Sequence, residues 1–133
     1  MVVPSDAAQL PALMSFIQEF WSQAQLPAAQ AVAFELALEE TFTNVVMHGS
    51  PAGSTPQVEV SLHLVGDDLT MTVADNGPPF NPLSLPAPDV SAGLRERPVG
   101  GHGVHLVGKM MDAVRYQRVG VRNCLSMTKR LAR

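Results

Sequence analysis

The sequence of 133 residues has little of several features that mark well-known protein classes. It contains one cysteine, Cys124, which excludes a disulfide framework and a cysteine-based zinc site and fits a reducing compartment. Aromatic residues make up only 5%, so stacking of nucleic-acid bases on an aromatic surface is not expected. Positive charge is not in excess either. Nine Lys and Arg against twelve Asp and Glu give a net charge of −3, which argues against a surface for phosphate backbones.

Long apolar runs are also missing. The first ten residues have neither the basic region nor the apolar run of a signal peptide, and no stretch approaches the ~20 apolar residues of a membrane span. With 46% hydrophobic and 16% charged residues, however, the chain is apolar enough to build a packed core. We therefore expect one cytoplasmic domain over residues 1–133 that binds neither nucleic acid nor membrane.

Hydrophobic periodicity predicts two helices in the first third of the chain. Ser5 or Asp6 is a candidate N-cap for the first helix, whose apolar residues recur at helical spacing over residues 10–21. Pro27 opens a second helical stretch over residues 28–48, at the first-turn position where proline is tolerated. The three residues before Pro4 are too few to decide whether a short edge strand precedes the helices.

The period then changes to that of strands. Apolar and polar residues alternate over 57–64 and 69–74, which predicts an antiparallel hairpin, and a second hairpin is expected over 114–129. Residues 76–98 hold six of the eleven prolines, which indicates a long irregular loop, with a lid over about 81–97. An apolar helix is expected over 104–111. This order predicts an α+β fold, an α/β sandwich with helices on one face of a mostly antiparallel sheet.

The second predicted helix carries polar side chains beside its apolar face. At about 100° per residue, Glu40, Asn44 and His48 follow one another at intervals of four and border that face, while Glu39 lies on its other flank. The amide oxygen of Asn44 is a hard ligand suited to Mg²⁺. The Glu40 carboxylate can orient or deprotonate an attacking hydroxyl or water. The alternative is the solvated face of an ordinary amphipathic helix.

A carboxylate ends the second strand of the first predicted hairpin. A half-buried Asp75 at this point can accept a hydrogen bond from an exocyclic amine such as that of adenine. Gly77, two residues later, lets the backbone come close to the ring. The alternative is a turn in which these residues only reverse the chain.

Glycines open the last predicted helix, in Gly100-Gly101-His102-Gly103. Their backbone N–H groups are free to face an anion, and the N-terminus of a helix adds a favourable partial positive charge. A glycine-rich cap without a ligand is the alternative. The spacing of a P-loop follows, but Met110 occupies the position where Ser or Thr must hold Mg²⁺, and no strand precedes it. The dinucleotide fingerprint fails as well, because Leu106 replaces its third glycine.

Taken together, these three groups of candidate residues resemble the N, G1 and G2 boxes of the GHKL ATPase superfamily, which has the Bergerat fold. The boxes are Glu40-x-x-x-Asn44, Asp75-x-Gly77 and Gly101-x-Gly103. The segments "LALEETFTNVVMHG", "VADNGPPFNP" and "RPVGGHGVHLVGKMMD" are similar to those of the anti-sigma-factor serine-protein kinases of bacterial switches. The resemblance covers roughly residues 5 to 130.

The resemblance implies a binding site for ATP and Mg²⁺ between the helices and the loop. Glu40 matches the catalytic carboxylate, Asn44 the Mg²⁺ ligand and Asp75 the adenine-binding acid. Gly77 matches the close backbone approach beside the adenine, and Gly101 and Gly103 match the phosphate-contacting glycines. The family phosphorylates a serine or threonine on a small antagonist protein with a STAS fold. It also sequesters a sigma factor, typically as a homodimer.

The sequence departs from the commoner Asp-x-Gly-x-Gly form of the G1 box. Pro79 replaces the second glycine, removes a donor N–H and fixes φ. A second interpretation is therefore a nucleotide-gated sequestering module that holds ATP without transferring phosphate, although the presence of both Glu40 and Asn44 favours the enzyme. A third, the ATPase domain of a histidine kinase, is disfavoured because no phospho-accepting helix precedes the boxes. A fourth is a structural domain without a ligand.

Overall fold

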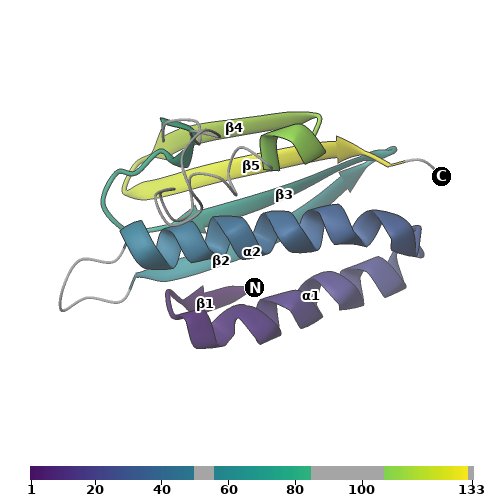
Figure 1. The fold of residues 1–133 in the computed structure, drawn as a ribbon, viewed down its shortest axis with the longest axis horizontal. Helices are drawn as coiled ribbons and strands as arrows, with labels where there is room; N and C mark the ends of the chain where they lie inside the picture. The colour runs from purple at the N-terminus through teal and green to yellow at the C-terminus, as the bar shows by residue number, and fades with distance from the viewer. Residues whose placement is uncertain (50–55, 85–106, 132–133) are drawn as a thin grey trace, which may run out of the picture.

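The fold is a five-stranded antiparallel sheet with two long helices packed on one of its faces (Figure 1). The computed structural model describes residues 1–49, 56–84 and 107–131. The strands are β1 (Val2–Pro4), β2 (Gln57–Val65), β3 (Asp68–Asp75), β4 (Ala113–Val119) and β5 (Arg122–Arg130). They lie side by side in the order β1-β2-β3-β5-β4, so that β3 occupies the centre.

The two helices follow short 3₁₀ turns. The turn Ala7–Gln9 leads into α1 (Leu10–Gln23), and the turn Ala28–Gln30 leads into α2 (Ala31–His48). Asp6 is the N-cap of the first turn, because its Oδ1 accepts a hydrogen bond of 2.9 Å from the N–H of Ala8. A further short turn is η3 (Pro82–Ser84), and residues 107–110 are helical.

A tryptophan fastens the end of α1 to the start of α2. The indole N–H of Trp21 donates a hydrogen bond of 2.8 Å to the carbonyl of Pro27, and its ring lies 5.4 Å from that of Phe34. Burying the ring while pairing its N–H avoids an unsatisfied donor in the core. The contact fixes the turn between the two helices, so that α1 lies beside α2 on the same face of the sheet (Figure 1).

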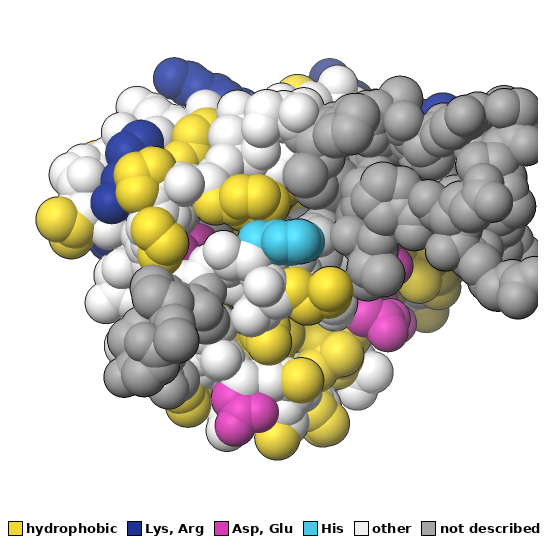
Figure 2. Space-filling view, turned by 60° about the vertical axis from the view of Figure 1, so that its left-hand side comes forward, with side chains coloured by type: hydrophobic (Ala, Val, Ile, Leu, Met, Phe, Trp, Pro, Cys, Tyr) yellow, Lys and Arg dark blue, Asp and Glu magenta, His cyan; other side chains and the backbone are white. Residues whose placement is uncertain are grey.

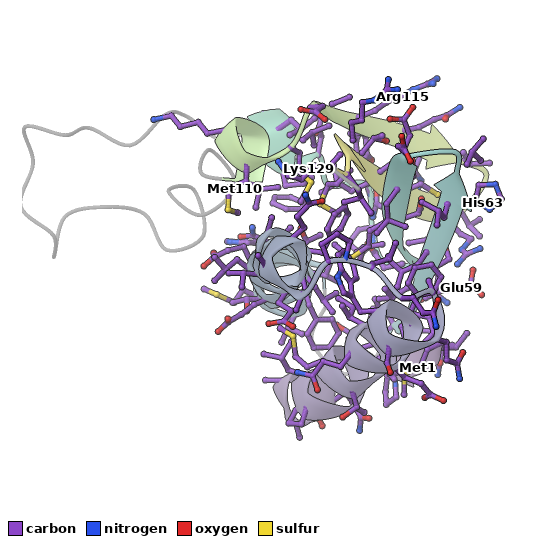
Figure 3. All side chains as sticks on the ribbon, turned by 90° about the vertical axis from the view of Figure 1, so that its right-hand side faces the viewer. Met1, Glu59, His63, Met110, Arg115 and Lys129 are labelled. Atoms are coloured by element: carbon purple, nitrogen blue, oxygen red, sulfur yellow. The ribbon has the colours of Figure 1, made fainter. Side chains whose placement is uncertain are left out.

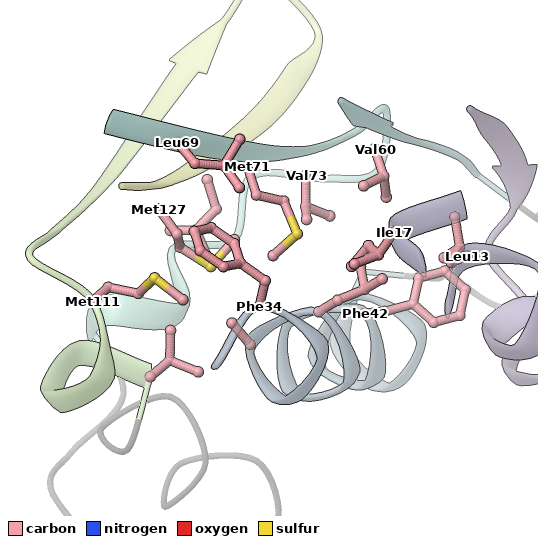
Figure 4. Close-up of a cluster of buried hydrophobic side chains, with 14 of the residues drawn as sticks. Leu13, Ile17, Phe34, Phe42, Val60, Leu69, Met71, Val73, Met111 and Met127 are labelled. Carbon is pink, nitrogen blue, oxygen red and sulfur yellow. The ribbon is translucent and has the colours of Figure 1, made fainter. Parts of the chain in front are cut away.

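The hydrophobic core lies between α2, α1 and the inner face of the sheet (Figure 4). Alternation along the strands sends every second side chain into it, and spacing of three or four residues does the same along the helices. Its fully buried large apolar side chains are Leu13, Ile17, Phe34, Leu38, Phe42, Val58, Val60, Leu69, Met71, Val73 and Met127.

The other face of the sheet carries polar side chains. Figure 3 shows Glu59, His63 and Arg115 on the side of the sheet away from the helices. Lys129 belongs to the inner set, and its Nζ donates a hydrogen bond of 2.9 Å to the carbonyl of Met110, in the helical segment (Figure 3). This polar-out, apolar-in division is the one expected of an antiparallel sheet covered on one side.

The predicted fold class is confirmed, and both predicted hairpins are present. The structure adds β1, which pairs with the edge of β2 and which three residues of sequence could not establish. Of the helix predicted over 104–111, residues 107–110 are helical and residues 104–106 lie outside the described part. Within the described residues, neither long helix has the length and apolar character to cross a bilayer.

The core supplies a direct test of the packing. Phe34 is fully buried, and we expect Phe34→Ala to lower the free energy of unfolding by about 3–5 kcal/mol, because it removes apolar contacts and leaves a cavity. Val32, on the same helix, is 54% exposed, so Val32→Ala should change the free energy of unfolding by less than about 0.5 kcal/mol. Urea unfolding followed by circular dichroism measures both. Equal losses would contradict the orientation of α2.

Candidate functional site

A hollow opens between the C-terminal half of α2 and the ends of β3, β4 and β5. Its lining residues are Thr41, Asn44, Val45, Gly49, Val73, Asp75, Phe80, Pro82, Tyr116, Asn123 and Leu125. Figure 2 turns this end of the molecule toward the viewer, and hydrophobic and uncharged side chains predominate on it. A mostly apolar hollow with a few convergent polar groups is typical of a small-molecule site.

Asn44 is the most unusual polar residue of the hollow. Its side chain is only 1% exposed, and neither its Nδ2 nor its Oδ1 has a hydrogen-bond partner in the described part of the chain. The sequence predicted that Asn44 borders the apolar face of the helix, but α2 lies so close to the sheet that the residue is inside. A buried amide without partners costs free energy, so this group marks a place where a water, an ion or a ligand atom would be stabilised.

Glu40 lies one turn before Asn44 on α2 and does not line the hollow. Its side chain is half-buried, whereas that of Glu39 is exposed. At the end of the helix, His48 is exposed, and its ring stacks on that of Phe80 with centroids 5.1 Å apart and planes at 21°. The predicted stripe of Glu40, Asn44 and His48 therefore runs from the flank of α2, through the hollow, to the segment that follows β3.

Asp75 reaches the hollow from the end of β3. It is 4% exposed, and so more deeply buried than the half-buried carboxylate that the sequence predicted. Within the described residues, both of its hydrogen bonds end on Oδ1, from the N–H of Gly77 at 2.9 Å and from Nδ2 of Asn123 at 3.1 Å. The second oxygen, Oδ2, is then the acceptor that remains for a donor group of a ligand.

Gly77 makes a close approach, but to another part of the protein. A Cβ at this position would lie 2.3 Å from the carbonyl oxygen of Gly49 and 3.0 Å from Oδ1 of Asp75. Only glycine fits between them. The glycine predicted to admit a nucleotide ring therefore also lets the segment after β3 pack against the end of α2.

Asn123, on β5, is the functional candidate that sequence reasoning missed. It is 4% exposed and pairs directly with Asp75 in the sheet. Its Nδ2 donates to Asp75 and, at 2.8 Å, to the carbonyl of Pro78, while its Oδ1 accepts from the N–H of Phe80 at 3.1 Å and from the hydroxyl of Tyr116. One signal was available, because an amide on the strand face that also carries Leu125 and Met127 interrupts an apolar pattern.

Arg118, on β4, also holds the segment that follows β3. Nη1 of Arg118 donates a hydrogen bond of 2.9 Å to the carbonyl of Gly77. With the two bonds from Asn123, three backbone groups around Pro79 have side-chain partners: the carbonyls of Gly77 and Pro78 and the N–H of Phe80. The segment is therefore fixed without the N–H that Pro79 lacks.

Magnesium is the metal that the resemblance implies. Among the described residues, no three His, Cys, Asp or Glu side chains gather to hold a metal ion. Mg²⁺ usually keeps several waters and takes only one or two protein ligands beside substrate phosphates. The unpartnered Oδ1 of Asn44 fits that role as a single protein ligand. The predicted phosphate glycines, Gly101 and Gly103, and residues 85–97 of the predicted lid lie outside the described residues.

Comparison with known families decides the class of this fold. Residues 3–129 match the histidine kinase-like ATPase domain family. The chain belongs to this family. The predicted GHKL recognition is thereby confirmed. The hollow is lined by Asn44 and Asp75, which belong to the predicted N and G1 boxes.

Individual relatives agree with the family assignment. The serine/threonine-protein kinase BtrW of Bordetella bronchiseptica is 29% identical over 97 residues, which are 73% of this chain and 68% of BtrW. The RsbU and RsbW domains of Rv1364c from Mycobacterium tuberculosis superpose with a TM-score of 0.66 at 14% identity, over 100% of this chain and 32% of that one.

A histidine kinase has the same fold. The histidine kinase domain of the Erythrobacter litoralis EL346 blue-light activated histidine kinase superposes with a TM-score of 0.59 at 17% identity, over 97% of this ATPase domain and 62% of that chain. Our chain thus spans less than two thirds of these two solved chains. At such identities the two structures show the shared fold alone.

The two buried asparagines should respond to the same substitution in opposite directions. Among the residues that the structure describes, Asn44 has no partner and Asn123 has four, and a buried polar group left unpaired costs about 1–3 kcal/mol. We therefore expect Asn44→Leu to raise the free energy of unfolding of the nucleotide-free protein by about 1 kcal/mol. Asn123→Leu should lower it by about 2 kcal/mol. Urea unfolding measures both, and a destabilised Asn44→Leu variant would show that the amide is already paired.

Proposed function

We propose that this ATPase domain is an ATP-dependent serine/threonine protein kinase of a bacterial partner switch. It phosphorylates a STAS-type anti-sigma antagonist and sequesters a sigma factor or another effector. Support comes from one observation above all: the buried amide of Asn44, which has no partner among the described residues, lies one turn from Glu40 and shares a hollow with the carboxylate of Asp75. A magnesium nucleotide needs an oxygen ligand for the metal at its phosphate end and a hydrogen-bond acceptor at its base end.

Each residue has a distinct part in the proposed reaction. Oδ2 of Asp75 would accept a hydrogen bond from the amino group of adenine, and Oδ1 of Asn44 would hold Mg²⁺ at the phosphates. Mg²⁺ would neutralise the charge that develops as the γ-phosphoryl group passes from ATP to the attacking oxygen, its bond to the ADP oxygen breaking so that ADP leaves. The Glu40 carboxylate orients the serine or threonine hydroxyl of the partner and takes its proton as the oxygen attacks. The family resemblance assigns the phosphate contacts to Gly101 and Gly103.

The relative BtrW supports the choice of a hydroxyl acceptor, because its name describes a serine/threonine-protein kinase. A homodimer in the cytoplasm belongs to the same proposal, as do the STAS antagonist and the sigma factor. In this proposal, Pro79 does not abolish transfer, since the segment around it is held by the side chains of Arg118 and Asn123.

The catalytic carboxylate can be tested by two neighbouring substitutions. With MgATP and a STAS partner, we expect Glu40→Ala to slow the appearance of phosphorylated partner by about 10²–10⁴-fold, because the hydroxyl loses its base. ATP binding should change only a few-fold, since Glu40 does not line the hollow. Mass spectrometry of the partner measures the added phosphate.

Glu39→Ala is the matched control, because Glu39 is exposed on the same helix. It should leave transfer near the wild-type rate. Loss of transfer in Glu39→Ala and not in Glu40→Ala would contradict the assignment. A wild-type protein that binds ATP and phosphorylates no partner would favour the sequestering module.

The base end of the site has its own test. Asp75→Ala removes the acceptor for the adenine amino group, and a hydrogen bond to a charged group contributes about 1.5–3 kcal/mol. We therefore expect calorimetry with MgATP to show binding weakened by about tenfold or more. Asp112 directly precedes β4, is exposed and lies outside the hollow, so Asp112→Ala should retain wild-type affinity. Unchanged binding in Asp75→Ala would remove Asp75 from the site.

A further inference from the structure

The β4–β5 hairpin does more at the site than complete the sheet. Asn123 contributes a saturated amide, in which two donor bonds and two acceptor bonds go to four different residues. Three of these partners, Asp75, Pro78 and Phe80, belong to the end of β3 and the segment after it. A buried amide with all its bonds made can adopt only one orientation, and its partners are held with it.

The consequence for Asp75 is chemical as well as geometric. Oδ1 already accepts from Asn123 and from the N–H of Gly77, at 3.1 Å and 2.9 Å. With Oδ1 taken up by two protein donors, Oδ2 is the carboxylate oxygen left to accept a hydrogen bond from a ligand. The remaining oxygen then attracts a ligand atom that carries a proton and repels one that carries a lone pair.

We propose that Asn123 is a positioning residue that fixes Asp75 as a pure acceptor and thereby sets the preference of the site for a 6-amino purine over a 6-oxo purine. The inference rests on the proposed nucleotide site and adds to it a residue on another strand whose polar atoms are all paired within the protein. Tyr116 supports the arrangement from β4, because its hydroxyl donates to Oδ1 of Asn123.

The test compares ATP with inosine triphosphate, which differs by a carbonyl oxygen in place of the 6-amino group. Calorimetry of the whole chain with each magnesium nucleotide gives two dissociation constants and their ratio. The wild type should prefer ATP. In Asn123→Ala we expect ATP binding to weaken about tenfold and binding of inosine triphosphate to change little, so that the ratio falls about tenfold. A merely structural role would weaken both nucleotides alike.

Asn76→Ala is the matched control. Asn76 is the residue directly after Asp75, is exposed, and uses its Oδ1 to accept a hydrogen bond of 2.7 Å from the N–H of Gln57. The substitution removes an amide of the same size beside the site without touching Asp75. The variant should keep the wild-type ratio of the two dissociation constants.

Two milder variants keep the proposal testable if Asn123→Ala does not fold. Asn123→Asp preserves shape and both acceptor bonds but replaces the donor that faces Asp75, so the ratio should fall at least as far. Tyr116→Phe frees Asn123 from one of its four bonds and should lower the ratio by less.

The outcomes separate the two proposals. A wild-type protein that binds neither nucleotide overturns the proposed function. A wild-type protein that prefers ATP, together with folded Asn123 variants that keep the full preference, overturns only the role of Asn123.

Discussion

The pairing of β3 with β5 places Asp75 directly opposite Asn123, and the arrangement of the site depends on this register. The two residues hydrogen-bond inside the protein, and α2 packs over β3 so that Asn44 lies in the same hollow. A shift of one residue in the register would turn either side chain to the outer face, because side chains alternate along a strand. Leu125 and Met127 follow Asn123 on the same face of β5 and are buried. A shift of one residue would expose them to solvent, and this cost opposes it.

The two ends of the hollow have opposite hydrogen-bonding states. At the end formed by β3 and β5, Asn123 has all its partners, and the backbone around Pro79 is held by side chains. At the end formed by α2, both polar atoms of Asn44 are without partners in the described residues. A satisfied network is rigid and an unsatisfied amide is costly, so the end at β3 and β5 is already ordered, whereas the end at α2 retains an uncompensated polar group.

Much of this could be predicted from the sequence because it depends on local spacing. Period-two alternation predicted the strands, helical spacing predicted α1 and α2, and the order of Glu40, Asn44, Asp75 and Gly77 indicated the family. The short β1 could not be predicted, since three residues carry no period and only the edge of β2 gives them a partner. The burial of Asn44 could not be predicted either, because helical spacing places a residue on a face of a helix but does not say how wide the buried face is.

By itself, then, the sequence determined which side chains point to the same side of each helix or strand, and in which order the candidate groups occur. Only the tertiary structure decided which of those groups share hydrogen bonds. Asn123 and Asp75 are far apart along the chain, and neither has a local partner that reveals the other. Gly77 likewise serves a close contact with Gly49 that no neighbouring residue predicts. Such contacts depend on how whole elements pack, because backbone periodicity constrains direction along one element and not distance between two.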